Sequence, residues 1–342
     1  MFYNPAMAAD RDLGVAFVRA WAAPGTRRRA GWEATAATGV RGLRLLDETD
    51  AFGPFLFTES NPAAFEVLRR NVEARPTARA RLADARRAPD DGPFDYVDLD
   101  PFGSPIPFVD AGLSSVRTGG VLAVTATDLI VLAGAQPRAT VRRYGARPVR
   151  ARLGPEGGLR ILLAYIAGRA RSAGRAVAPL LAYARDHHVR AYLEVRGADA
   201  PPDPVRVVAP ETWDGPPLPG DPPFGPLWMG PIVDPGIAER MVVPDGAERP
   251  AETAQFLERL RDDAAVPTAF YYEPNSLAHR LLLPAPTALS EWLATLRDRG
   301  YRAGRTHARP EGFRTDAPRA VVEALARERA AAAQSQNARV RA

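Results

Sequence analysis

The stretch "DLDPFGSP", residues 98–105, places reactive side chains directly after an apolar run that is typical of a buried strand. A carboxylate can accept a hydrogen bond from the N–H of an amine that is conjugated to a ring. This hydrogen bond holds the nitrogen lone pair out of conjugation, and the carboxylate can then take up the proton that the nitrogen loses. An aromatic ring beside it can stack a base that has been turned out of its helix. Asp100 and Phe102 are therefore the predicted catalytic pair, and Pro101 stiffens the turn between them. Asp98 lies on the same strand face and is expected to support the loop from one pleat deeper.

Three other loops carry residues that suit an adenosine-shaped ligand. The small-residue run "EATAATGVRG", residues 33–42, lies between a short candidate strand and a helix, where backbone amides can meet a ligand. Glu59 follows Gly39 by 59 − 39 = 20 residues, the separation at which an acidic side chain binds a ribose diol. Asp84 of "LADA" can accept a hydrogen bond from an adenine amino group. Each residue alone could equally be a turn or helix-start residue, and only their combination predicts a binding site.

The elements that must position these loops alternate between strands and helices. Strands are predicted at about 55–58, 94–99, 121–127, 177–183 and 189–195, with helices after Asn61, over 105–117 and over 157–171. This alternation predicts an α/β fold with a mostly parallel sheet covered on both faces. The last two strands are too close for a crossover helix, so they should form an antiparallel hairpin. That arrangement is typical of class I S-adenosylmethionine-dependent methyltransferases, which are Rossmann-like.

Proline and glycine divide the chain into predicted parts. We expect a catalytic domain over 1–200, a Pro/Gly-rich linker region over 201–250, a smaller α+β domain over 251–330 and a basic, disordered tail over 331–342. Helices are predicted at 252–263, 276–283 and 288–299 of the smaller domain. A helix is expected to begin at Arg319 and to fray toward the end of the chain.

Composition excludes several classes of protein. The chain has no cysteine, which excludes disulfides and thiolate chemistry, and its four histidines are scattered, so no metal site is expected. No segment has the run of about 20 apolar residues that spans a membrane, and no secretory signal begins the chain, so a cytoplasmic location is expected. The net charge is +5 and the cations are arginines, which either indicate a nucleic-acid partner or reflect a GC-rich genome.

Seven ordered stretches resemble one family. They are "FYNPAMAADRD" (2–12), "ATAATGVRGLR" (34–44), "DLDPFGSP" (98–105), "VTATD" (124–128), "ARDHHVRAYL" (184–193), "GPLWMGP" (225–231) and "GRTHARPEGFRTDAP" (304–318). Together they resemble the tRNA (guanine-N2) dimethyltransferases that act on guanosine 26, in their archaeal form. The resemblance implies methyl transfer from S-adenosyl-L-methionine to the exocyclic N2 of a tRNA guanosine. We expect the protein to be a monomer.

The resemblance also implies roles for individual residues. Arg11, Arg41, Glu59, Asp84 and Ala85 would bind the cofactor, with Arg41 at its methionine carboxylate, Glu59 at the ribose and the last two at the adenine. Asp100 would be the catalytic carboxylate, and Phe102 with Phe2 would line the guanine pocket. Arg11 and Arg41 could instead form ion pairs with a nearby carboxylate such as Asp12 or Glu33. Phe2 could instead simply pack in the core. Thr35 stands where relatives commonly carry an apolar residue.

Two further expectations concern the second half of the chain. Relatives carry cysteines near residues 225–231 that can bind zinc; their absence implies that packing around Trp213, Phe224 and Trp228 holds the linker region. The smaller domain is expected to contact the tRNA backbone, unless its arginines form only a solvated face. The arginines are Arg259, Arg261, Arg280, Arg302, Arg305, Arg309 and Arg314, beside Tyr301 and Phe313.

Three alternative functions remain at this point. The chain could act on another tRNA guanosine or on DNA, it could bind tRNA without catalysis, or it could be a nicotinamide-dependent dehydrogenase with a similar nucleotide site.

Overall fold

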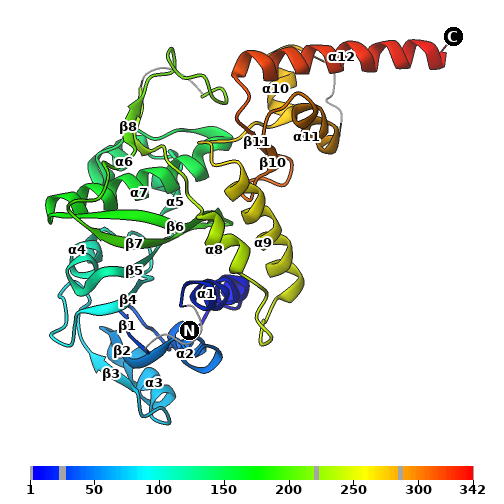
Figure 1. Ribbon diagram of the computed structural model, residues 1–342. Helices are drawn as coiled ribbons and strands as arrows, with labels where there is room; N and C mark the ends of the chain where they lie inside the picture. The colour runs from blue at the N-terminus through cyan, green and yellow to red at the C-terminus, as the bar shows by residue number, and fades with distance from the viewer. Residues whose placement is uncertain (1–2, 23–27, 219–222, 284–287, 342) are drawn as a thin grey trace.

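The computed structural model describes residues 3–22, 28–218, 223–283 and 288–341 (Figure 1). The strands are β1 (Arg29–Glu33), β2 (Phe52–Glu59), β3 (Ala78–Leu82), β4 (Phe94–Leu99), β5 (Val116–Ala126), β6 (Arg175–Arg185), β7 (His188–Gly197), β8 (Val205–Val208), β9 (Phe224–Trp228), β10 (Ala303–Arg305) and β11 (Phe313–Thr315). The α-helices are α1 (Ala8–Trp21), α2 (Val40–Glu48), α3 (Pro62–Val72), α4 (Ile106–Ser115), α5 (Leu129–Leu132), α6 (Pro137–Tyr144), α7 (Gly154–Ser172), α8 (Pro235–Arg240), α9 (Pro250–Ala265), α10 (Pro274–Arg280), α11 (Leu289–Asp298) and α12 (Arg319–Arg341). Two short 3₁₀ helices are η1 (Pro5–Met7) and η2 (Ala151–Leu153).

One seven-stranded sheet carries the first half of the chain. Its strand order is β3-β2-β1-β4-β5-β7-β6. Strands β1 to β5 are parallel, and β7 runs antiparallel to both β5 and β6. The predicted parallel sheet with a final hairpin is therefore confirmed. Because parallel strands end at the same edge, the loops after β1, β2, β3 and β4 come together there.

Helices cover both faces of this sheet. Helix α1 packs against α2, α8 and α9, whereas α4, α5 and α6 pack against α7 (Figure 1). Helix α1 escaped the sequence analysis because the charged triplet Asp10-Arg11-Asp12 interrupts its apolar pattern. The structure buries all three of these side chains, so α1 is an internal helix despite its charges.

The Pro/Gly-rich region folds onto the catalytic part. Strands β8 and β9 pair antiparallel, and Phe224 and Trp228 of β9 are buried in the main core. The buried Arg160 of α7 donates a hydrogen bond of 2.7 Å to the carbonyl oxygen of Trp228. The ring of Trp213 meets that of Phe270 edge to face at 6.1 Å. Packing around these aromatic residues is what the sequence predicted for a chain without cysteines.

A second, smaller core lies in the C-terminal part. It gathers Tyr272, Leu277, Trp292, Leu296, Phe313, Val322 and Leu325. Helix α9 packs with the main core through Phe256 and Leu260 instead. The predicted domain boundaries at 200 and 250 stay a prediction.

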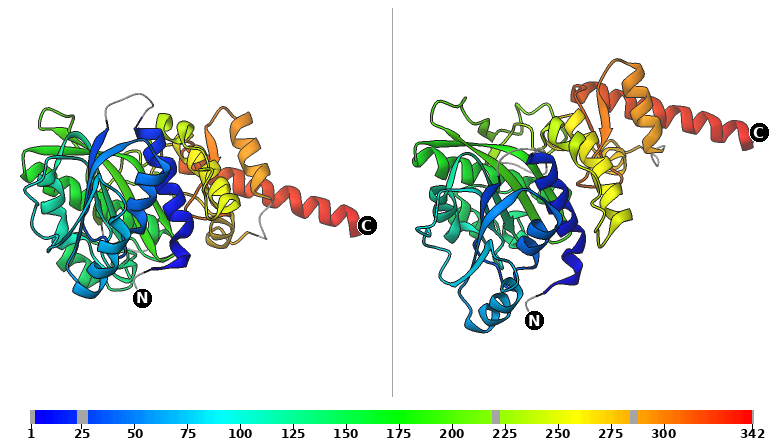
Figure 2. Two further views of the ribbon diagram at one scale, coloured as in Figure 1. Left: turned by 90° about the horizontal axis from the view of Figure 1, so that it is seen from below. Right: turned by 60° about the horizontal axis from the view of Figure 1, so that its bottom comes forward.

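Helix α12 extends away from the rest of the chain in both views of Figure 2. It begins at Arg319, as predicted, and continues to Arg341. The predicted disorder of residues 331–342 stays a prediction.

The structure corrects one predicted RNA contact. Arg314 is 1% exposed and forms ion pairs with Glu156 of α7 and Asp263 of α9. Phe313 is also fully buried, so neither residue can reach a nucleic acid. The sequence pattern failed here because arginine is usually exposed and only tertiary partners reveal a buried one.

Within the described ranges, no helix is long and apolar enough to cross a membrane. The same residues contain no group of three or more acidic, histidine or cysteine side chains that could hold a metal ion.

Candidate active site

Asp100 lies at the carboxyl end of β4, where two residues fix its position. Its Oδ2 accepts a hydrogen bond of 2.8 Å from Nη2 of Arg41, which comes from the first turn of α2. Its backbone N–H donates to Oγ1 of Thr35 at 3.0 Å, so the hydroxyl of Thr35 helps to fix the loop. The Asp100 side chain remains 27% exposed, so a substrate amine can still approach it.

The charge state of Asp100 follows from its neighbours. Burial alone would raise its pKa, but the positive charges of Arg41 and Arg190 outweigh that effect and lower the pKa below its ordinary value. Asp100 is thus an ionised hydrogen-bond acceptor at neutral pH.

Phe102 projects from the same loop and is 89% exposed. Its backbone neighbour Gly103 fixes the loop by donating to Oγ1 of Thr127 at 2.7 Å, just beyond the end of β5. A fully exposed phenylalanine beside a carboxylate is available for stacking on a flat ligand. Phe2, the other predicted pocket residue, lies outside the described residues.

Asp98 is buried one pleat below Asp100 and does not face the open edge. Arg190 of β7 binds both of its oxygens, at 2.8 and 2.6 Å, and the hydroxyl of Tyr96 donates to it at 2.7 Å. Both of its oxygens thus accept hydrogen bonds from buried side chains of the sheet.

Glu33 at the end of β1 is buried and accepts a 3.0 Å hydrogen bond from the backbone N–H of Gly42. Burial, together with the nearby negative charge of Asp98, raises its pKa to about 8. Two carboxyl groups near one edge therefore differ in charge at neutral pH: Asp100 is ionised and Glu33 is protonated.

Glu59 ends β2 and binds backbone on both sides. One oxygen accepts from the N–H of Ala37 and the other from the N–H of Asn61, both at 2.8 Å. It thereby ties the small-residue loop after β1 to the start of α3. Its role at a ribose stays a prediction, for which its half-buried position at the sheet edge is suitable.

Asp84 lies in the loop after β3, and Ala85 next to it is buried. A hydrogen-bonded ion pair with Arg86 lowers the pKa of Asp84 to about 2. A cavity of about 470 Å³ opens beside Asp84 and is also lined by Trp32 and Thr58. This hollow gives a planar group space next to the residue that the resemblance assigned to adenine.

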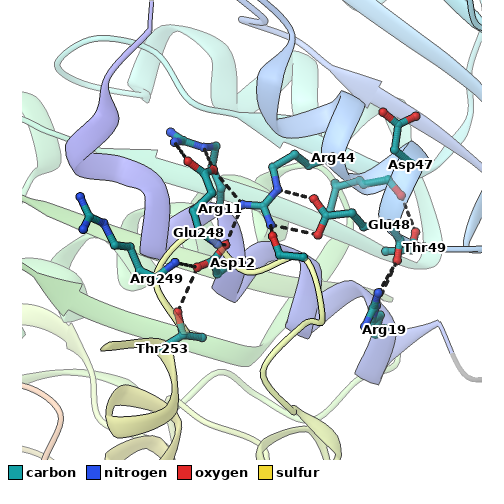
Figure 3. A network of polar contacts seen from close by, with 12 residues as sticks. Arg11, Asp12, Arg19, Arg44, Asp47, Glu48, Thr49, Glu248, Arg249 and Thr253 are labelled. Atoms are coloured by element: carbon teal, nitrogen blue, oxygen red, sulfur yellow. Dashed lines mark hydrogen bonds and ion pairs between the residues drawn. The ribbon is translucent and has the colours of Figure 1, made fainter. Parts of the chain in front are cut away.

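Arg11 is held in a polar network between α1 and the start of α9 (Figure 3). Its guanidinium binds Glu248 through Nε and Nη2, both at 3.2 Å, and donates to the carbonyl oxygen of Asn4 at 3.0 Å. The ion-pair partners of Arg11 and Arg41 are thus Glu248 and Asp100, where the sequence suggested Asp12 or Glu33. A direct contact of Arg11 with a cofactor stays a prediction.

One guanidinium nitrogen of Arg41 has no hydrogen-bond partner among the described residues. Its Nη1 and the hydroxyl of Tyr192 are both buried without a hydrogen-bond partner in the described part of the chain. Both atoms face Gly14 of α1, where an added Cβ would lie 3.7 Å from Nη1 and 3.4 Å from the hydroxyl oxygen. Buried donors without partners are costly, and both of these atoms can donate to an anionic group such as a carboxylate.

Sequence reasoning missed Tyr192 and Arg190 as parts of this site. They alternate on one face of β7, in the stretch "VRAYLEV", and reach the site because β7 lies beside β5. Only the pairing of β7 with β5 brings them there, and no local pattern encodes that pairing.

The sheet order and the acidic loops at its carboxyl edge define a class I S-adenosylmethionine-dependent methyltransferase. The family model for N2,N2-dimethylguanosine tRNA methyltransferase matches residues 1–205 and 222–327, and the chain belongs to this family.

Individual relatives agree with this assignment. A tRNA (guanine(26)-N(2))-dimethyltransferase of Methanospirillum hungatei is 35% identical, over 93% of this chain and 89% of the relative. The corresponding enzyme of Thermococcus kodakarensis is also 35% identical, over 94% and 92%. A solved structure of Trm1 from Pyrococcus horikoshii with S-adenosyl-L-methionine superposes with a TM-score of 0.82, at 30% identity over 94% of this chain and 93% of that one.

Proposed function

We propose that this chain transfers methyl groups from S-adenosyl-L-methionine to the exocyclic N2 of guanosine 26 in tRNA and forms dimethylguanosine. The relatives named above carry this activity in their names. The observation that carries the proposal is Asp100, an ionised and accessible carboxylate beside an exposed aromatic ring at the carboxyl edge of the sheet.

Bound S-adenosylmethionine supplies a methyl group activated by its sulfonium centre. Asp84 and Ala85 would hold the adenine, Glu59 the ribose, and Arg41 with Tyr192 the methionine carboxylate. The unpartnered Nη1 of Arg41 and the hydroxyl of Tyr192 support this placement.

Asp100 would accept an N–H bond of the guanine amine and orient the nitrogen lone pair toward the methyl group. An exocyclic nitrogen that gains a methyl group becomes strongly acidic, so even a carboxylate of lowered pKa can receive its proton. The ring of Phe102 would stack on the extruded base and fix its plane. Because Phe102 is open to solvent, a base that already bears one methyl group can also be accommodated.

Asp100→Ala tests the proton-acceptor role. We expect turnover to fall by about 10²–10⁴-fold, the usual contribution of a positioned acid or base, with affinity for S-adenosylmethionine nearly unchanged by calorimetry. Asp110→Ala is the matched control, because Asp110 on α4 forms an exposed ion pair with Arg169 of α7. Turnover of the Asp100 variant near that of the control would disprove the role.

Product analysis tests the substrate. Unmodified tRNA incubated with labelled cofactor should yield labelled N2,N2-dimethylguanosine at position 26. Label at another guanosine would support the alternative substrate, and no label despite tRNA binding would support a catalytically inactive binding protein. The monomeric state and the cytoplasmic location expected above remain part of the proposal, and light scattering of the purified chain tests the first.

A further inference from the structure

The segment between β5 and α7 carries a basic surface that the sequence analysis did not use. Residues 129–155 contain six arginines and no acidic residue, although the whole chain has 40 acidic residues for 45 basic ones. The arginines are Arg138, Arg142, Arg143, Arg147, Arg150 and Arg152, and all six are exposed.

Most of these arginines have no protein partner. Arg143 contacts Asp128 at 3.4 Å and Arg152 contacts Glu273 at 2.7 Å. The side chains of the other four form no hydrogen bond or ion pair with any residue that the structure describes. Like charges that are gathered without counter-charges repel one another, so the surface is suited to an anionic ligand.

This basic surface is fixed to the catalytic loop. Tyr144 at the end of α6 is buried, and its hydroxyl lies 2.9 Å from Oγ of Ser104 and donates to Asp128 at 2.9 Å. Ser104 is two residues from Phe102, so these hydrogen bonds tie the end of α6 to the loop that carries the proposed base-stacking ring.

The basic surface also continues toward the C-terminal helices. A groove of about 330 Å³ is lined by Arg150 and Arg152 on one side and by Tyr272, Leu277 and Arg280 on the other. Arg280 is thus the one predicted RNA contact of the C-terminal part that lines this groove.

We infer that the 129–152 segment, through Arg138, Arg142, Arg147 and Arg150, binds the phosphate backbone of the tRNA next to the target guanosine. The inference rests on the proposed function. A nucleotide that reaches Phe102 must bring its flanking phosphates past the neighbouring helix α6, and arginine binds phosphate oxygens in a bidentate manner. The contacts are to the backbone, so they would position the RNA without reading its sequence.

The double variant R142Q/R147Q tests this inference, with R70Q/R79Q as the matched control. Arg70 on α3 and Arg79 on β3 are exposed and unpaired among the described residues, and they lie toward the opposite edge of the sheet. Both variants therefore lose the same charge through the same chemical change.

We expect R142Q/R147Q to weaken binding of unmodified tRNA by about tenfold or more near 0.1 M salt, measured by fluorescence anisotropy. The slope of log K against log salt should fall by about 1–2, one unit for each lost phosphate contact. The KM for tRNA should rise, while the affinity for S-adenosylmethionine should stay unchanged by calorimetry. R70Q/R79Q should match the parent in every measurement.

Parent-like binding and salt slope for R142Q/R147Q, or an equal loss in R70Q/R79Q, would overturn the inference alone. A parent chain that neither binds nor methylates tRNA would overturn the proposed function and the inference with it. Arginine-dependent pelleting with phosphatidylserine vesicles and unchanged tRNA binding would assign the surface to a membrane and would likewise overturn the inference.

Discussion

At the scale of single residues, the site separates two carboxyl groups by their surroundings. Asp100 faces an arginine and stays ionised, whereas Glu33 is buried beside another acid and holds its proton. The difference has a measurable consequence, because Glu33 must lose a proton on unfolding whenever the pH exceeds its ordinary pKa of 4.5.

Glu33→Gln tests this charge state in the cofactor-free protein. The folded pKa of Glu33 is raised to about 8, so its contribution is fully present below pH 4.5 and is lost as the pH rises toward 8. The parent should lose up to about 1.4 kcal/mol of unfolding free energy per pH unit in that window from this one group. The glutamine variant keeps the acceptor for Gly42 and should show a shallower decline in urea unfolding at pH 5 to 8. Parallel pH profiles would mean that Glu33 is already ionised in the fold.

At the scale of elements, helix α1 joins the sheet to the C-terminal half. Asp12 of α1 is fully buried and accepts the backbone N–H groups of Glu248 and Arg249, at 3.0 and 2.8 Å, just before α9 begins (Figure 3). Arg44 of α2 binds the same carboxylate at 2.7 Å. Burial would raise the pKa of Asp12, but these donors lower it, so the carboxylate is ionised and anchors the segment that leads into α9.

Asp12→Ala should cost roughly 2–4 kcal/mol of unfolding free energy, because it leaves the backbone donors of Glu248 and Arg249 without their acceptor and the partly buried Arg44 without one partner. Asp47→Ala is the control, since Asp47 forms an exposed ion pair with Arg75 and should cost less than about 1 kcal/mol. Hydrogen exchange of α9 should speed up in the Asp12 variant alone. Equal losses of unfolding free energy in the two variants would show that the buried contacts of Asp12 contribute nothing specific.

The elements also show what a single sequence can predict. The strands at 94–99 and 189–195, the helix after Asn61 and the hairpin were predictable, because apolar runs and the Asn-Pro cap are local signals. Asp100 and Phe102 could be singled out because both lie in one short loop after a predicted strand, and their catalytic roles stay a prediction. The partners Glu248 for Arg11 and Tyr192 beside Arg41 were not, because each depends on contacts between distant segments.

At the scale of the whole molecule, a buried network links the C-terminal part to the catalytic part. Arg314 of β11 binds Glu156 of α7 and Asp263 of α9, and His307 also binds Asp263. Burial would raise the pKa of Asp263, but Arg314 and His307 lower it, which keeps the acid charged inside the protein. In this network, buried charges of each part are therefore paired with opposite charges of the other part.

Arg314→Met should destabilise the chain by roughly 3–5 kcal/mol, because it leaves two buried carboxylates with too few partners. Arg302→Met is the matched control, since Arg302 pairs with Asp316 at the surface and should cost less than about 1 kcal/mol. Thermal and guanidinium unfolding measure both. A parent-like Arg314 variant would mean that water or movement of the parts compensates for the lost guanidinium.

The contacts of α1 affect how the chain can be truncated and when it can complete its folding during synthesis. Asp12 and the N–H of Glu248 are 236 positions apart, so a ribosome has made every strand of the large sheet long before this acid receives its donors. A gene fragment that stops after β7 would encode Asp100, Phe102 and the loops after β1, β2 and β3, yet it would leave Asp12 without the donors that the later chain supplies. We therefore expect a stable, active fragment to extend beyond Thr253, which also donates to Asp12.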